Sequence, residues 1–404
     1  MEYFSFSKHS LSLMTCPHCA SASNYSTLEL VQSKKSIYFK CTQCNSFYPI
    51  QQVPYISNIC SQKNCKQECI SACFPGAIFI LKNRLTAINY EKCQFCNQCV
   101  ISCPLKAIVC FWTPFFKLST EAPTIIAENA TTTISNEGIS FKDFNLPHFI
   151  RFRPDLLLNS LNTKLWMSVV VDCYEFIKDH ILESSSIIFD NGCLNNSFKT
   201  LLEGHSNPTL NVLSADVKLY SESYFGRYFS PVEFLHDGRT LPLVSGKIDV
   251  VTSNYVLEHV SDPHKYLKEI HRVLKWEGLL FISVPTPRWF IAYFLRNFWY
   301  LYPKHLKNDF KQAIRHPVRD FLTYNAHEKD WNKEKEGKIT FIDEIKRWKI
   351  KNWDDLYLNN GFQIIEKNLF GNAFSLAGKK FFLNRPFFNF IFSGIISLYI
   401  LSKR

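Results

Sequence analysis

Twelve of the fifteen cysteines in this 404-residue chain lie within its first 103 residues, and their spacing constrains the fold more than any other feature. They form three groups of four: Cys16, Cys19, Cys41 and Cys44; Cys60, Cys65, Cys69 and Cys73; and Cys93, Cys96, Cys99 and Cys103. Thiolates are soft, charged donors that bind zinc and iron tightly. The sequence therefore predicts three metal sites with four thiolate ligands each.

The start of the chain bears on its compartment. No basic stretch followed by an apolar run opens it, so we expect no secretory signal. Cysteines at metal-ligand spacing without such a signal favour metal binding in a reducing compartment over disulfides. We therefore expect a cytoplasmic protein. The remaining cysteines are predicted to be small buried residues: Cys110, Cys173 and Cys193.

The first group consists of two Cys-x2-Cys knuckles separated by 21 residues. Each knuckle places two thiolates on one tight turn, and a site closed by four cysteines leaves no position for water, so we expect a structural zinc ion. Together with the stretch Phe47-Tyr-Pro-Ile50, this segment resembles the small zinc-ribbon proteins that activate RNA and protein methyltransferases and that also occur fused to them. The resemblance implies a zinc ribbon over residues 1–56.

The third group has the spacing Cys-x2-Cys-x2-Cys-x3-Cys-Pro, which matches the bacterial ferredoxin run. The second, with Cys-x4-Cys-x3-Cys-x3-Cys-Phe-Pro, resembles the first cluster run of the ferredoxin-like domain in the ribosome-recycling ABC ATPase. The resemblance implies a two-cluster 4Fe-4S, ferredoxin-like α+β module over residues 57–115. It also implies an exchange of fourth ligands, with Cys60, Cys65, Cys69 and Cys103 on one cluster and Cys93, Cys96, Cys99 and Cys73 on the other. Zinc at these eight cysteines is the alternative.

The second half of the chain has the pattern of an α/β domain. A stretch rich in Ser, Thr, Ala and Asn predicts a linker over residues 116–160. Short apolar strands then alternate with helices, which predicts a doubly wound parallel sheet over 161–380. These strands are expected at 186–190, 211–215, 248–252 and 279–284. Before the last one, Asp262 can cap a helix that Pro263 opens and Gly278 ends.

The most specific segment of this domain runs from Asp249 to Gly278. Its sequence, with Asn254-Tyr-Val-Leu-Glu-His259 and then Glu-Ile-His-Arg-Val-Leu-Lys, resembles the small-molecule class of S-adenosylmethionine (SAM) methyltransferases. The segment Trp353–Phe362 matches the closing part of that family. The resemblance implies a Rossmann-like fold, SAM as cofactor and methyl transfer as activity.

The resemblance also implies roles for residues at the strand ends, where open α/β sheets bind their ligands. Asp216 would bind the ribose hydroxyls, and Asp237, followed by Gly238, would accept from the adenine amino group. Asn254 would line the methyl-transfer pocket. His259 would take a proton from the acceptor, or else it packs under the loop while the transfer proceeds through positioning alone.

The first cofactor loop departs from the family pattern. The family has Asp-x-Gly-x-Gly-x-Gly, because glycines let the backbone approach the cofactor. This chain has Asp190-Asn-Gly192-Cys-Leu194-Asn-Asn196, so one glycine of three remains. Asn196 tolerates a left-handed backbone. The loop therefore predicts either SAM binding through Asp190 and Gly192, or a core that has lost catalysis.

The C-terminal third is basic. Residues 286–404 carry 21 Lys and Arg against 11 Asp and Glu, which favours anionic partners. Phe387–Leu401 is nearly all apolar with cations on both sides, yet shorter than the roughly 20 residues of a spanning helix. We expect 381–404 to form a tail that contacts a membrane surface. The alternatives are a last strand and helix packed into the core, or a lid over the acceptor site.

The leading hypothesis is SAM-dependent methyl transfer to a small or lipid-linked acceptor, with the iron–sulfur and zinc modules serving electron transfer to a redox partner or partner docking. One rival is RNA methylation, which the relatives of the zinc ribbon suggest and which would need a basic groove with stacking aromatic residues. The other is a non-catalytic electron-transfer or redox-sensing protein on a decayed methyltransferase scaffold.

Overall fold

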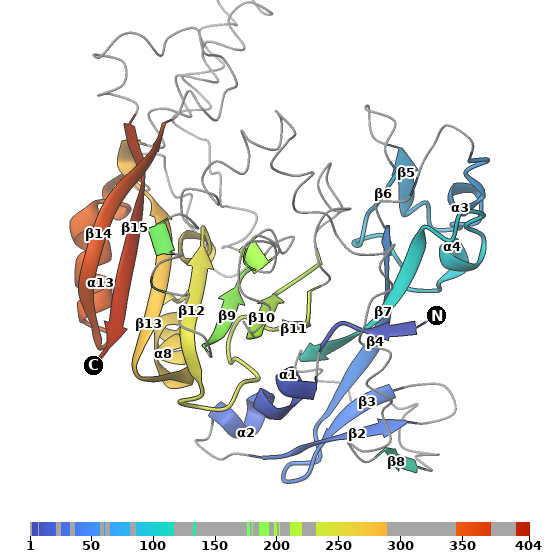
Figure 1. Cartoon of the computed structure of the whole chain (residues 1–404), viewed down its shortest axis with the longest axis horizontal. Coiled ribbons are helices and arrows are strands. Elements are labelled where there is room, and N and C mark those ends of the chain that lie inside the picture. Colours follow the sequence, from blue (N-terminus) through green and yellow to red (C-terminus); the bar gives the residue numbers. More distant parts are fainter. Residues whose placement is uncertain are drawn as a thin grey trace, which may run out of the picture. The chain divides into compact units, whose positions relative to one another are not determined.

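The computed structural model describes residues 2–6, 8–21, 26–32, 37–56, 60, 65–80, 86–116, 132–134, 176–177, 180, 186–193, 198–199, 202, 211–219, 232–288, 345–372 and 393–404. The chain forms two units (Figure 1). The first comprises Met1–Ser160, Leu182–Val250 and Arg272–Lys275, and the second comprises Leu161–Ile181, Val251–His271 and Trp276–Arg404. The chain therefore passes from one unit to the other inside the predicted methyltransferase domain.

An antiparallel sheet forms the cysteine-rich part of the first unit. Its strands, in spatial order, are β8 (Thr132–Ile134), β2 (Leu28–Gln32), β3 (Ile37–Cys41), β4 (Phe47–Ile56) and β7 (Ile108–Phe116). The long strands β4 and β7 pair from Ile50 opposite Pro114 to Ile56 opposite Ile108 (Figure 1). Because β8 pairs with β2, the predicted linker contains a strand of this sheet.

Two short helices and a strand precede the sheet: β1 (Glu2–Phe4), α1 (Lys8–Leu13) and α2 (Pro17–Ser21). β1 runs parallel to β7. After α1, Thr15 donates its N–H to the carbonyl of Pro242 and Met14 forms a bridge with Leu243. Ser10 and the ammonium group of Lys199 both bond the buried carboxylate of Glu233. The N-terminal segment is thereby fastened to the methyltransferase part of the same unit.

The ferredoxin-like segment repeats one local structure at an offset of 30 residues. Its elements are α3 (Glu68–Ser71), β5 (Ile78–Ile80), β6 (Thr86–Ile88) and α4 (Gln98–Ile101). Each helix follows a residue in the left-handed region, Gln67 at φ 59° and Asn97 at φ 59°. The strands β5 and β6 pair antiparallel. The predicted α+β arrangement of this segment is thus present.

Three parallel strands complete the first unit: β9 (Ile187–Asn191), β10 (Asn211–Asp216) and β11 (Phe234–His236). β9 and β10 confirm two predicted strands of the sheet to within a residue. β11 pairs parallel with the end of β7, with Leu235 opposite Phe115 and His236 opposite Phe116. One mixed sheet thus contains the parallel strands β9, β10 and β11 and the antiparallel strands of the cysteine-rich part, which confirms the α/β class.

Strands β12 (Ile248–Asn254) and β13 (Leu274–Pro285) continue into the second unit, which also contains η4 (Leu257–His259), α13 (Ile350–Leu358), β14 (Phe362–Asn372) and β15 (Ser393–Lys403). Helix α8 (Pro263–Val273) has the predicted cap, because Asp262 Oδ1 accepts from the Lys265 N–H at 3.0 Å. Its predicted end is wrong. The helix stops at Val273, and β13 begins at Leu274 with Glu277 at φ 63°.

The apolar C-terminal run is a strand over its described part. β15 lies between β13 and β14 and pairs antiparallel with both. Four of its aliphatic side chains are fully buried: Ile396, Leu398, Ile400 and Leu401. The alternative of a last strand packed into the core therefore describes residues 393–403, in place of a free tail, while Phe387 lies outside the described residues. No helix in the described ranges combines the length and the apolar character needed to cross a membrane.

Candidate functional site

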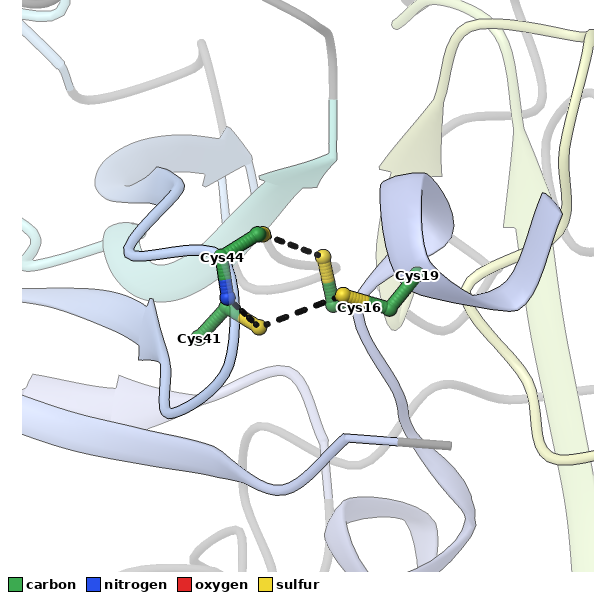
Figure 2. Close-up of side chains that lie close together, drawn as sticks. All are labelled: Cys16, Cys19, Cys41 and Cys44. Carbon is green, nitrogen blue, oxygen red and sulfur yellow. Dashed lines mark hydrogen bonds between the residues drawn. The ribbon is translucent and has the colours of Figure 1, made fainter. Parts of the chain in front are cut away.

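Four cysteines of the first group converge between two turns (Figure 2). Cys16 directly precedes α2, and Cys19 lies within this helix. Cys41 ends β3, and Cys44 lies in the turn that follows. The Sγ atoms of Cys16 and Cys44 are 3.6 Å apart, and those of Cys19 and Cys41 are 3.7 Å apart. Among the described side chains with metal-binding atoms, this is the group whose ligand atoms all lie within 4.8 Å of one another.

This geometry fits one tetrahedral ion. A metal–sulfur distance of about 2.3 Å gives sulfur–sulfur edges of about 3.8 Å, close to both measured separations. Three of the four cysteines are buried and Cys44 is partly exposed, so the centre lies inside the fold. The four cysteines can therefore hold a metal, as their spacing predicts.

Hydroxyl groups surround these sulfurs. Tyr48 Oη lies 3.0 Å from Cys16 Sγ, Ser26 Oγ lies 3.2 Å from Cys41 Sγ, and Ser46 Oγ lies 3.1 Å from Cys44 Sγ. Burial raises the pKa of Cys41, but the bonds from Ser26 and from nearby backbone N–H groups outweigh it and lower that pKa to about 6. A thiolate can only accept, so each hydroxyl donates once the sulfur is ionised.

The cysteines of the second and third sequence groups can be sorted by which of their thiolates raise one another's pKa. Burial and then the nearby thiolates of Cys103, Cys60 and Cys65, in that order, together raise the pKa of Cys69 to about 11. Burial likewise raises the pKa of Cys99 to about 12, with contributions from Cys93, Cys110, Cys73 and Cys96. Cys103 is therefore an electrostatic neighbour of Cys69 in the second sequence group, and Cys73 is one of Cys99 in the third. These neighbours agree with the exchange of fourth ligands that the ferredoxin resemblance implies.

Backbone N–H groups point at the same sulfurs in both halves of the repeat. Ala77 donates to Cys73 Sγ and Ala107 donates to Cys103 Sγ, each at 3.2 Å. Such donors favour a charged sulfur. The repeat therefore includes the surroundings of the ligands as well as the cysteines themselves.

The first cofactor loop leaves the end of β9 with its backbone anchored to β10. The N–H groups of Gly192 and Cys193 both donate to the carbonyl of Ala215, at 2.9 and 3.1 Å. Gly192 has φ 77°, a conformation that glycine adopts without strain. Asp190 and Asn191 are buried just before it. The predicted substitute Asn196, together with Leu194, lies outside the described residues.

The residues predicted to bind the ribose and the adenine, Asp216 and Asp237, lie at the ends of β10 and β11. Asp216 is buried, and its Oδ1 accepts from the Val217 N–H at 2.7 Å. Asp237 Oδ1 accepts from the N–H groups of Arg239 and Thr240, so this carboxylate also closes its own turn. A Cβ at Gly238, which has φ 74°, would meet Val217 Cγ1 at 3.2 Å. The turn after β11 therefore needs glycine here.

His236 and Asn191 were not predicted as part of this site. The Gly238 N–H donates to His236 Nδ1, which leaves the proton on Nε2, and this atom is 3.2 Å from Asn191 Oδ1. The pair ties the end of β9 to the end of β11 across β10. Its signal in the sequence was the polar residue that ends each of two apolar strands.

The second unit contains the remaining predicted residues. Asn254 ends β12, and its Oδ1 accepts from Ser283 Oγ at 3.1 Å, while the buried Nδ2 has no hydrogen-bond partner in the described part of the chain. The His259 side chain is 40% exposed, whereas that of Glu258 is 2% exposed. Burial raises the pKa of Glu258 to about 8. Glu258 is thus a buried ionisable group that the sequence analysis did not single out.

Two segments of the chain match known families. Residues 190–282 match the family described as a methyltransferase domain, and residues 86–109 match the family described as a 4Fe-4S binding domain. The first match begins at Asp190, and the second includes the whole third cysteine group. These two segments are therefore similar to a methyltransferase domain and to a 4Fe-4S binding domain. No curated protein matches the chain.

Many solved structures resemble parts of this chain. A putative SAM-dependent methyltransferase from Listeria monocytogenes has 12% identity and a TM-score of 0.34 over 58% of this chain and 99% of its own. A complex of a methyltransferase activator with a putative methyltransferase from Haloferax volcanii has 13% identity and a TM-score of 0.35, over 60% of this chain and 97% of its own. A SAM-dependent methyltransferase from Aquifex aeolicus has 12% identity and a TM-score of 0.34, over 62% of this chain and 98% of its own. Because these TM-scores are low, the assignment of the domain depends on the match of residues 190–282.

Proposed function

We propose that this protein is a SAM-dependent methyltransferase that acts on a small or lipid-linked acceptor. The observation that carries the proposal is the match of residues 190–282 to a methyltransferase domain. The strand ends support it, because buried Asp190 and Asp216 end neighbouring parallel strands, where ligands of open α/β sheets bind. SAM, when bound, supplies a methyl group on a sulfonium, whose transfer depends mainly on positioning.

The chain's own residues have distinct roles in this proposal. Asp216 binds the ribose hydroxyls, and Asp237 accepts from the adenine amino group while its Oδ1 keeps the turn closed. Gly192 lets the backbone of the first loop approach the cofactor. The unpartnered Nδ2 of Asn254 offers a buried donor to a bound polar group, since a buried donor without a partner is costly.

His259 is the proposed proton acceptor. Its exposed ring can reach an acceptor from solvent, and its Nε2 lies 4.0 Å from Glu258 Oε1. The resulting role is general base catalysis for acceptors that lose a proton on methylation.

The cysteine modules hold metal in this proposal. One zinc ion binds the first group as a closed structural site, which the sulfur–sulfur separations support. Two 4Fe-4S clusters bind the other eight cysteines, with Cys73 and Cys103 exchanged between the sequence groups. The clusters supply electron transfer or a docking site for a redox partner.

Calorimetric titration with SAM tests the enzyme assignment. Wild-type protein purified without oxygen should bind SAM, and Asp216→Ala should weaken binding by roughly 1.5–3 kcal/mol, the scale of a hydrogen bond to a charged group. Asp262→Ala, which removes a carboxylate that caps α8, is the control and should leave the affinity unchanged. An unchanged affinity in Asp216→Ala rejects its role, and no binding by wild type favours the non-catalytic redox protein.

A further inference from the structure

Two groups of apolar side chains in the first unit share members. One group surrounds the cluster cysteines and includes buried Cys69, Cys99 and Cys103, with Phe95 packed against it. The other consists of Cys193, Val232 and Leu235. Phe115 and Leu219 pack against both groups. The loop that carries the cluster ligands and the loop proposed to bind SAM are therefore separated by a single layer of side chains.

Phe95 is the contact on the cluster side. It lies between the ligands Cys93 and Cys96, and its own N–H donates to Cys93 Sγ at 3.4 Å. Its ring meets Phe115 edge-on, with centroids 6.2 Å apart and planes at 75°. Phe95 has φ 54°, which is unfavourable for a bulky residue and persists only where the surroundings impose it. Ligation of Cys93 and Cys96 would provide that constraint.

Phe115 is the contact on the cofactor side. It pairs with Leu235 between β7 and β11 and packs against the group that contains Cys193. Cys193 directly follows Gly192, and Leu219 follows Asp216 by three residues. Leu219, close after Asp216, thus packs against the group around the cluster cysteines, and Phe115 joins that group to the one that contains Cys193.

We propose that Phe115 is a positioning residue that couples the cluster of Cys73, Cys93, Cys96 and Cys99 to the SAM loop. A bound cluster fixes Phe95, Phe95 fixes the ring of Phe115, and Phe115 holds Cys193 and the loop backbone in the binding conformation. SAM therefore binds more tightly to cluster-loaded protein, by about 5- to 150-fold, the usual range of coupling between two sites. This inference rests on the proposed function.

Substitutions on β7 test the coupling in the full, cluster-loaded chain. Phe115→Ala should weaken SAM binding at least about fivefold. Phe111→Ala is the matched control, because Phe111 lies on the same strand and in the group around the cluster cysteines but outside the group around Cys193. Phe111 is buried and Phe115 is only half-buried, so general destabilisation would affect Phe111→Ala more. Phe115→Tyr keeps the ring and should restore binding.

Electron paramagnetic resonance of the reduced cluster gives a second readout, because coupling between two binding sites is reciprocal. SAM should alter the cluster signal in wild type and in Phe111→Ala, and leave it unaltered in Phe115→Ala. Equal SAM affinities of cluster-loaded and iron-free protein overturn the inference and leave the proposed function intact. Equal losses in the two alanine variants also overturn it. Failure of every form to bind SAM overturns both.

Discussion

The cysteine modules and the methyltransferase domain place their ionisable groups in opposite ways. The first cysteine group brings four thiols together, with Sγ–Sγ pairs at 3.6 and 3.7 Å. The segment similar to a methyltransferase domain instead buries single carboxyl groups: Asp190, Asp216 and Glu258. A group of like-charged thiolates is stable only with a cation, whereas an isolated acid is kept by hydrogen bonds or by protonation. We therefore expect the first region to depend on metal, and the second on its hydrogen bonds.

The largest expected effect comes from removing a ligand of the first group. Cys41→Ser should abolish zinc binding and unfold the ribbon, because structural zinc contributes roughly 10 kcal/mol or more to the folding of such sites. Elemental analysis and thermal denaturation measure the two losses. Cys110→Ser removes a buried thiol outside the proposed ligand set and should keep the metal. Full zinc content in Cys41→Ser would mean that Cys41 is not a required ligand of this metal.

The exchanged ligands predict the next effect. Wild type should contain about eight irons, and Cys73→Ser should lose about four of them. If Cys73 binds the same cluster as the third group, as proposed, the cluster that remains should have the same paramagnetic resonance spectrum as in Cys96→Ser. In Cys69→Ser the other cluster should remain. A spectrum of Cys73→Ser that matches Cys69→Ser instead would show that the fourth ligands are not exchanged.

The sequence predicted the convergence of the first cysteine group better than the limits of the strands and helices. Ligand spacing is local, so two Cys-x2-Cys knuckles were enough to place the first group. The end of α8 depended on packing across the sheet. Gly278 suggested a helix end, but Leu274 is fully buried in β13, and burial there outweighs the local signal. The apolar run ending at Leu401 has the same composition as a membrane-contacting tail, and only its pairing with two strands distinguishes it.

The positions of the residues proposed to bind the cofactor were predicted in part. Asp216 and Gly192 lie at strand ends as expected, because the family pattern carries this information residue by residue. The link between His236 and Asn191 joins positions 45 residues apart, and no local pattern predicts which two polar side chains meet. Glu258 was passed over because a single sequence does not reveal that its carboxyl is buried while the ring of the next residue is exposed.

Glu258 provides a test of how the methyltransferase domain tolerates a buried acid. Its pKa is raised from 4.5 to about 8, so its contribution to stability is full below pH 4.5 and falls as the pH rises toward 8. Wild type should lose up to about 3 kcal/mol between pH 6 and 8 from this residue, and Glu258→Gln should remove that slope. Urea denaturation across this range measures it, with Glu277→Gln at an exposed position as the control. If the free energy of unfolding of Glu258→Gln still falls between pH 6 and 8, another ionisable group causes the fall.

The smallest expected effect concerns a carboxylate whose partner is a backbone group. Asp262 caps α8 through the Lys265 N–H at 3.0 Å, and loss of such a cap typically costs about 1 kcal/mol. Asp262→Ala should therefore lower the free energy of unfolding by that amount, and Asp262→Asn, which retains a capping oxygen, should recover most of it. Neither should change the iron or zinc content, since this carboxylate stabilises a helix end and binds no metal. A loss of metal in Asp262→Ala would mean that the cysteine-rich region and the region that contains α8 unfold together. The two regions would then not be independent, although one depends on thiolate ligands and the other on single carboxyl groups.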